Sequence, residues 1–144
     1  MVDASRLSAL DNRLAADCTL LGLLGDTRVL AMNNTTLPWL ILVPETEQTE
    51  LYQLPHSMQQ AILRLTSECS RLLHDHYDCD KLNIASIGNI VSQMHIHIVA
   101  RNRQDYCWPD VVWGRVDPEA EQALDKAVLR QQLQTRFGKE FKPI

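Results

Sequence analysis

Gln93, His95 and His97 alternate with apolar residues along the segment 93–100. Alternation with a period of two predicts a β-strand with one buried face, so the three polar side chains should share the other face, about 6.5–7 Å apart. One amide and two imidazoles in a row on a rigid element suit binding or attacking an anionic group better than they suit filling a core. These three are therefore candidate catalytic residues.

An imidazole is a nucleophile near neutral pH because its reference pKa is about 6.5. It can attack phosphorus and form a covalent nucleotidyl intermediate, which divides one difficult displacement into two easier ones. The attacking nitrogen must be unprotonated, so the other ring nitrogen must be held as a donor, usually to a carbonyl oxygen. A second imidazole can bind phosphate oxygens or protonate the leaving group, and Asn83 and Asn89 are available as further donors.

A long amphipathic helix is expected before these residues. Apolar side chains recur at intervals of three or four residues between Met58 and Leu72, which predicts a helix over 57–76. Ser57 and Gln60 have the spacing of a capping box at its start. Because the apolar residues form one stripe, this helix should pack on a sheet.

The remaining segments complete an α+β pattern. Asp117 and Pro118 have the residue types of a helix start, and Gly138 those of a helix end. The segment 18–24 is apolar and fits either a helix or a strand. The other expected elements are a short helix over 5–16, a hairpin of strands 28–32 and 39–43, short strand 82–85, strand 93–101, an irregular loop over 102–116 and a last helix over 117–137. Together they predict a single α+β domain over 1–144, with an antiparallel sheet of about five strands, a long helix packed on it and a C-terminal helix.

The composition is that of an ordinary globular domain. The chain has 144 residues, of which 45% are hydrophobic and 22% charged, and a net charge of −4, which argues against broad nucleic-acid binding. Its four cysteines include no C-x-x-C pair, and Cys69 falls on the apolar stripe of the predicted helix. The segment Met1–Arg6 lacks the pattern of a signal peptide, and no stretch has the apolar length of a membrane span. We therefore expect a cytoplasmic protein that binds no membrane.

A metal site is the main chemical alternative. A His-x-His strand can supply two zinc ligands, and His74, His76 and Cys79 resemble a ligand cluster. However, His74 and His76 lie at the end of the predicted helix, where side chains two residues apart point in different directions. A histidine at a helix C-terminus is also explained by its favourable interaction with the helix dipole. We expect neither a metal ion nor another cofactor.

Further side chains could contribute to a site. Arg101 lies an even number of residues from His95, so it is expected on the same face of the strand and could reach a phosphate. An arginine at a strand end is, however, more often solvated. Trp108 and Trp113 could stack on a base or close the rim of a pocket, or they could anchor the long loop in the core.

The segment Met94–Val99 with Gln93 resembles the signature of the histidine triad (HIT) superfamily, His-φ-His-φ-His-φ-φ, in which φ is apolar. The stretch Leu82–Gly114 is particularly similar to a bacterial subgroup of small HIT proteins, in which Gly-Asn, Gln-φ-His-φ-His and Trp-Pro…Val-Trp-Gly recur. As an order of elements, the likeness covers about residues 17–115.

This resemblance implies an HIT-like fold and a nucleotide or nucleotide conjugate as the ligand. His95 would attack the α-phosphorus, His97 would be the third histidine of the signature, and Asn83, after a shift of one residue, would position the ribose or phosphate. Gly88 and Asn89 would form a substrate-binding loop. Family members are typically homodimers, and their substrates are nucleoside phosphates, phosphoramidates or dinucleoside polyphosphates.

The chain departs from the signature at its first histidine, which is replaced by Gln93. A glutamine can donate a hydrogen bond to phosphate but cannot carry a proton. Our hypothesis is that Gln93 donates to the phosphate and leaves His97 as the candidate acid, so that Gln93→His keeps or raises turnover. Two functions follow: a nucleotide hydrolase or nucleotidyl transferase that acts through a covalent His95 intermediate, or a nucleotide-binding module with little or no turnover.

Overall fold

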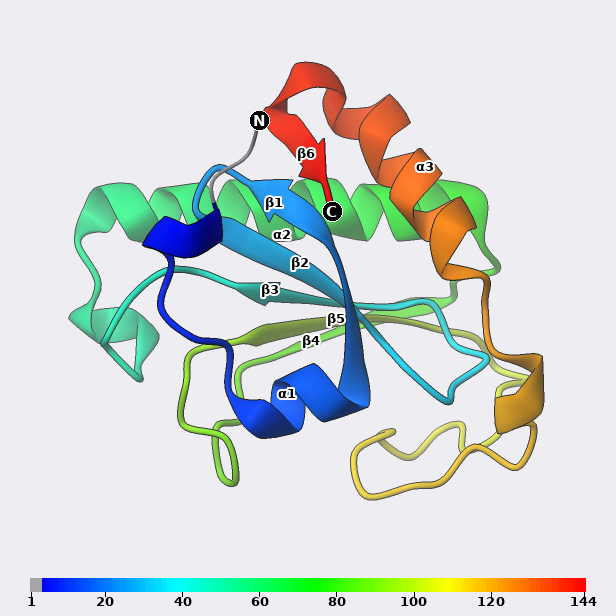
Figure 1. Cartoon of the computed structure of the whole chain (residues 1–144). Coiled ribbons are helices and arrows are strands. Elements are labelled where there is room, and N and C mark those ends of the chain that lie inside the picture. Colours follow the sequence, from blue (N-terminus) through cyan, green and yellow to red (C-terminus); the bar gives the residue numbers. More distant parts are fainter. Residues whose placement is uncertain (1–3) are drawn as a thin grey trace.

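An open antiparallel sheet forms the centre of the molecule in a computed structural model, which describes residues 4–144 (Figure 1). The strand order is β4-β5-β3-β2-β1-β6, six strands where about five were expected. The strands are β1 (Cys18–Leu24), β2 (Thr27–Met32), β3 (Trp39–Val43), β4 (Lys81–Ala85), β5 (Ile96–Arg101) and β6 (Phe141–Pro143). The helices are α1 (Asn12–Asp17), α2 (His56–His76) and α3 (Lys126–Phe137), and short 3-10 helices cover Ala4–Arg6, Leu51–Gln53, Ala120–Gln122 and Gly138–Glu140. The α+β fold with a long helix and a C-terminal helix is confirmed.

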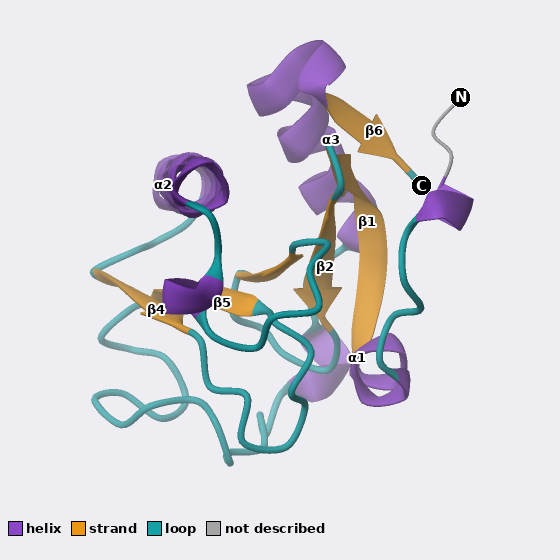
Figure 2. Ribbon diagram, turned by 90° about the vertical axis from the view of Figure 1, so that its left-hand side faces the viewer, coloured by secondary structure: helices purple, strands orange, loops and turns teal. Residues whose placement is uncertain are grey.

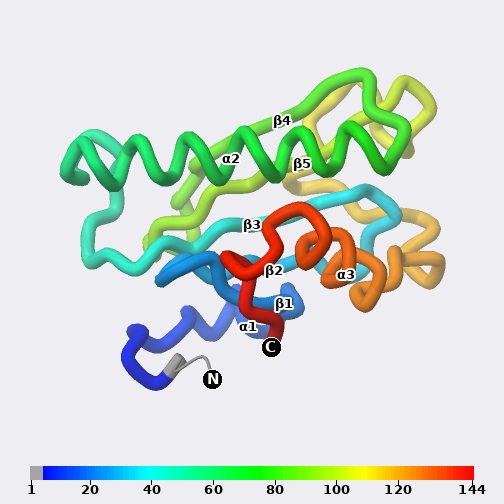
Figure 3. Tube along the Cα trace, turned by 90° about the horizontal axis from the view of Figure 1, so that it is seen from above, coloured from blue at the N-terminus to red at the C-terminus, as the bar shows by residue number. Residues whose placement is uncertain are grey.

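Two apolar clusters cover the two faces of the sheet. On one face, the buried side of α2, including Ile62, Cys69 and Leu73, packs against Ile96 and its neighbours in the sheet. Seen from above, α2 runs alongside β4 and β5, and α3 lies nearer β1 and β2 (Figure 3). The prediction that Cys69 belongs to the core is confirmed, because its side chain is fully buried.

The face of the sheet opposite α2 carries the polar side chain of His97. There α1 and the loop after β5 pack on a second cluster that includes Leu14, Trp39, Val99 and Val112. The side view shows α2 end-on and well apart from α1 (Figure 2). Because strand residues alternate between faces, Ile96 and Ile98 enter the cluster under α2 while His97 faces the side of α1.

The two chain ends of the described part differ from the sequence-based expectation. The predicted helix over 5–16 is a 3-10 turn followed by α1, and the ambiguous segment 18–24 is strand β1. The strand β6 was not foreseen; it pairs antiparallel with β1 at Gly22, where a Cβ atom would lie 2.5 Å from the Phe141 ring. Residues 1–3, part of the segment that argues against a signal peptide, lie outside the described range.

Two predicted helix starts are wrong. The capping box of Ser57 does not form, because Pro55 is the N-cap of α2 and makes no side-chain cap bond. The last helix begins at Lys126 with Asp125 as its N-cap, not at Asp117. The Asp117 carboxylate instead accepts hydrogen bonds from Thr36, whose backbone nitrogen lies 2.6 Å away. The predicted end of this helix at Gly138 is confirmed, with a φ of 57°.

Among residues 4–144, none of the helices has both the length and the apolar character that a membrane crossing requires.

Candidate active site

His95 and His97 line a cavity of about 790 Å³ on the face of the sheet that carries α1. This volume lies in the range of small-molecule sites. The walls come from segments far apart in the sequence: α1, the turn after β2, the loop 87–91 and the segment 112–117. Both imidazoles are nearly buried, with 7% of His95 and 5% of His97 exposed, so the cavity is their remaining access to solvent.

The protonation of His95 is fixed by a backbone carbonyl. Its Nδ1 lies 2.7 Å from the carbonyl oxygen of Gln93. Because a carbonyl oxygen only accepts, Nδ1 must carry the proton, and neutral His95 then has its lone pair on Nε2. This nitrogen has no hydrogen-bond partner within residues 4–144. The arrangement is the one that a nucleophilic imidazole requires.

His97 is held in the opposite tautomer. The indole nitrogen of Trp39 lies 3.0 Å from His97 Nδ1. An indole N–H only donates, so Nδ1 accepts and neutral His97 carries its proton on Nε2. Burial, with a smaller contribution from His95, lowers the pKa of His97 from 6.5 to about 4. At neutral pH, His97 is therefore an uncharged hydrogen-bond donor.

Gln93 does not share the face of the two histidines. The regular strand begins at Ile96, so the parity argument does not extend to position 93. The Gln93 side chain turns to the N-terminal segment, where its carbonyl accepts from the Asp11 backbone at 2.8 Å and its amide donates to the Ala9 carbonyl at 3.2 Å. Gln93 thus contributes its backbone to the site, through His95, while its side chain ties the N-terminal segment to β5.

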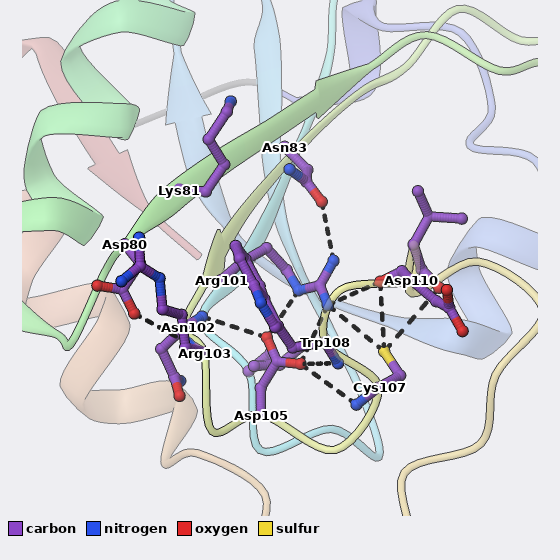
Figure 4. A network of polar contacts seen from close by, with 12 residues as sticks. Asp80, Lys81, Asn83, Arg101, Asn102, Arg103, Asp105, Cys107, Trp108 and Asp110 are labelled. Carbon is purple, nitrogen blue, oxygen red and sulfur yellow. Dashed lines mark hydrogen bonds and ion pairs between the residues drawn. The ribbon is translucent and has the colours of Figure 1, made fainter.

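Arg101 also lies outside the cavity, in a buried network (Figure 4). Its guanidinium makes a two-point ion pair with Asp105, at 2.8 and 3.0 Å, and only 1% of the Arg101 side chain is exposed. It also donates to the Asn83 side chain at 2.9 Å and lies under the Trp108 ring, 5.6 Å from its centroid. Asn83, Arg101 and Trp108, which were expected to bind substrate, are thus in contact with one another at the base of the 102–116 loop and are not among the described residues that line the cavity.

A family model described as HIT domain matches residues 13–104, which is more than half of the chain. The chain belongs to the HIT family. Three histidine triad proteins of known structure resemble it over nearly the whole chain. The protein from Bradyrhizobium japonicum is 36% identical with a TM-score of 0.79, covering 89% of this chain and 96% of its own.

The other two HIT proteins are similarly related. The protein from Marinobacter aquaeolei VT8 is 38% identical with a TM-score of 0.78, covering 90% of this chain and 96% of its own. The protein from Sinorhizobium meliloti 1021 is 31% identical with a TM-score of 0.78, covering 93% and 99%. No curated protein matches the chain.

Other residues of this HIT domain do line the cavity. Gly88 and Asn89 are among them, and Gly88 has a φ of 67° that favours glycine. Of the two tryptophans considered for the rim, Trp113 lines the cavity: its ring lies 5.4 Å from that of His97, and its indole nitrogen is buried without a partner in the described residues. Lining residues that the sequence did not reveal include Arg13, Asp17, Asn33, Asn34, Trp39, Arg115 and Asp117. Among these, Trp39 is the residue whose place the sequence indicated, because it lies on a strand expected in the sheet.

The cavity of the HIT domain carries little excess charge. Arg13 approaches Asp17 at 4.0 Å, and Arg115 is paired with Asp110 at 2.7 Å. In the described part of the chain, no three His, Cys, Asp or Glu side chains are grouped to hold a metal ion. His74 and His76 lie exposed at the end of α2, as helix geometry predicted.

The low pKa of His97 makes stability depend on pH. In the unfolded chain the imidazole gains a proton as the pH falls through 6.5, whereas in the folded protein it stays neutral until about pH 4. Between these values the unfolded state binds more protons, so acid favours unfolding. We expect the free energy of unfolding to fall with a slope approaching about 1.4 kcal/mol per pH unit, and by up to roughly 3 kcal/mol in total.

Denaturant unfolding of wild type and His97→Asn from pH 7 to pH 4 measures this effect as the difference between the two curves. The exposed His56 at the start of α2 supplies a matched control, His56→Asn, which should follow the wild type. Parallel curves for wild type and His97→Asn would contradict the expectation.

Proposed function

We propose that the protein is a nucleotide hydrolase or nucleotidyl transferase that attacks the α-phosphorus of a nucleotide conjugate with His95 Nε2. The supporting observation is the 2.7 Å contact between His95 Nδ1 and the Gln93 carbonyl, which leaves the Nε2 lone pair available beside a cavity of nucleotide size. Membership of the HIT family supports a nucleotide as the ligand.

In the proposed first step, Nε2 forms a bond to the α-phosphorus and the bond to the leaving group breaks. His97 donates its Nε2–H to a phosphate oxygen, where negative charge develops in the transition state. The backbone around Gly88 and Asn89 contributes to ligand binding, since both residues line the cavity. A water molecule or another hydroxyl acceptor then takes the nucleotidyl group, its proton is released to solvent, and the electron pair of the N–P bond returns to His95.

Trapping of the intermediate tests the proposal. The protein is incubated with a panel of nucleotide conjugates, quenched at alkaline pH to preserve the N–P bond, and analysed by peptide mass spectrometry. A nucleotidyl mass increment on His95 is expected. Its absence across the panel, together with thermal stabilisation by nucleoside monophosphates, would support the nucleotide-binding module instead, because a ligand of the native state raises stability by mass action.

We further propose that the protein is a cytoplasmic homodimer, as the family resemblance suggests, and that it binds no nucleic acid. The strand β4 lies at the edge of the sheet, where Ile84 is 51% exposed. Light scattering after size exclusion would reveal a monomer if the dimer proposal is wrong.

A further inference from the structure

Trp39 and His97 meet because of the sheet register. On the antiparallel pair β3–β5, Trp39 is opposite Val99 and Ile41 is opposite His97. Trp39 and His97 are therefore diagonal neighbours on one face, a separation that an aromatic side chain spans. The contact rests on two central strands and not on a mobile loop, so its geometry is fixed by the fold.

Three aromatic rings surround the His97 imidazole. The ring centroids of His95, Trp113 and Trp39 lie 4.9, 5.4 and 5.7 Å from that of His97, each in an edge-to-face arrangement. Within residues 4–144, the Trp39 indole N–H is the group that donates a hydrogen bond to His97 Nδ1, with a donor–acceptor distance of 3.0 Å. A second proton on His97 would have to sit on Nδ1, facing the indole N–H and beside the second imidazole. The surroundings thus oppose a cationic His97.

The other ionisable groups of the cavity are poor proton donors. The Asp117 carboxylate accepts three hydrogen bonds, two from Thr36 and one from the Glu119 backbone, and these outweigh burial and hold its pKa below the usual range. Burial raises the pKa of Cys18 to about 12 and also raises that of Tyr106. Apart from the two histidines, the remaining ionisable lining residues in the described part of the chain are the ion-paired Arg13, Asp17 and Arg115.

We propose that Trp39 is a positioning residue that fixes His97 as the neutral Nε2–H tautomer, so that the site accepts nucleotides whose leaving group departs as an anion without a proton from the enzyme. This rests on the proposed function. The His95 lone pair forms the N–P bond, and the electron pair of the broken P–O bond leaves with the oxygen. The preferred substrates are accordingly anhydrides and esters of acidic alcohols, in which a nucleoside 5′-phosphate is joined to a weakly basic oxygen.

Nuclear magnetic resonance of the unliganded protein tests the role of Trp39 without any need for turnover. Long-range ¹H–¹⁵N spectra at pH 7 distinguish a protonated from an unprotonated ring nitrogen. In the wild type we expect His97 to carry its proton on Nε2 alone, and in Trp39→Phe to show a mixture of tautomers. The matched control is Trp113→Phe, which alters a ring beside His97 but removes no hydrogen bond to it and should retain the wild-type tautomer.

A wild-type His97 protonated on Nδ1, or a Trp39→Phe spectrum identical to that of the wild type, would overturn the role of Trp39. The leaving-group preference is tested with two adenosine 5′-phosphodiesters, one of 4-nitrophenol and one of the much less acidic phenol. Since general acid catalysis typically contributes 10²-fold or more, its absence should make the nitrophenyl ester react at least about 10²-fold faster. Similar rates would refute the preference. Turnover of neither ester would refute the proposed function and the preference together, while the tautomer experiment would still decide the role of Trp39.

Discussion

Replacing His95 by asparagine should lower kcat for a nucleotide conjugate by at least roughly 10³-fold, because it removes the nucleophile. The Asn side-chain N–H can occupy the place of Nδ1–H and donate to the Gln93 carbonyl, which His95 Nδ1 approaches at 2.7 Å. The free energy of unfolding should therefore change by no more than about 1 kcal/mol. Steady-state kinetics and denaturant unfolding on the same preparations measure both quantities.

The controls separate the loss of the nucleophile from general damage to the site. Nucleoside monophosphate binding, followed by calorimetry, should remain within a few-fold of the wild type in His95→Asn, and His56→Asn on the exposed start of α2 should keep full turnover. If His95→Asn retains wild-type kcat, His95 is not the nucleophile, and a direct attack by water would have to replace the covalent route.

The sheet and the faces of the two histidines were accessible from the sequence because successive side chains of a strand point to opposite faces. Ile96 and Ile98 had to enter the core under α2, so His97 had to face the other side, whatever packs there. A different pattern placed β3 correctly at Trp39–Val43, because a continuous apolar run fits a strand covered on both faces.

The odd or even position of a residue along a strand tells which face its side chain occupies, but not which loop covers that face. Arg101 shares the face of His97, as predicted, yet the loop after β5 folds back over it and supplies Asp105 as a buried partner. Gln93 precedes the regular strand, so its side chain was free to turn to Ala9 and Asp11, 84 and 82 positions away in sequence. Such pairings depend on long-range packing, for which a single sequence holds no local signal.

The predicted starts of helices were wrong for a related reason. Asp117 has the residue type of an N-cap, and a carboxylate at that position can bind any nearby backbone N–H. In the folded chain one Asp117 oxygen does accept from the Glu119 backbone at 2.9 Å, as a cap would, while the other binds the Thr36 backbone at 2.6 Å and joins a distant segment. The α-helix nevertheless starts later, at Lys126. Local capping rules rank residue types but do not include competing partners from elsewhere in the fold.

Replacing Arg101 by methionine should lower the free energy of unfolding by roughly 3–5 kcal/mol, the usual loss when one partner of a buried ion pair is removed. The Asp105 side chain is 2% exposed and would be left without its guanidinium. Burial opposes ionisation of Asp105, but the hydrogen bond from Arg101 and those from the Asn102 and Cys107 backbone hold its pKa below the usual value. Without the guanidinium, burial raises the pKa of Asp105 with less opposition, so keeping this carboxylate charged at neutral pH lowers the free energy of unfolding. Denaturant unfolding at pH 7 measures the loss.

Two matched variants show whether the buried charge causes this loss. Arg64 forms an exposed pair with Glu140, with side chains 56% and 38% exposed, so Arg64→Met should lose about 1 kcal/mol or less. Adding Asp105→Asn to Arg101→Met should recover part of the stability, because the unpaired charge is then absent. The amide oxygen can still accept the hydrogen bonds from the Cys107 and Trp108 backbone, and only the bond from the Asn102 backbone to the other oxygen is lost. A double variant less stable than Arg101→Met would mean that the carboxylate stabilises the loop even without its partner. Equal losses in Arg101→Met and Arg64→Met would contradict the assignment of Arg101 as a structural residue and return it to consideration as a phosphate ligand.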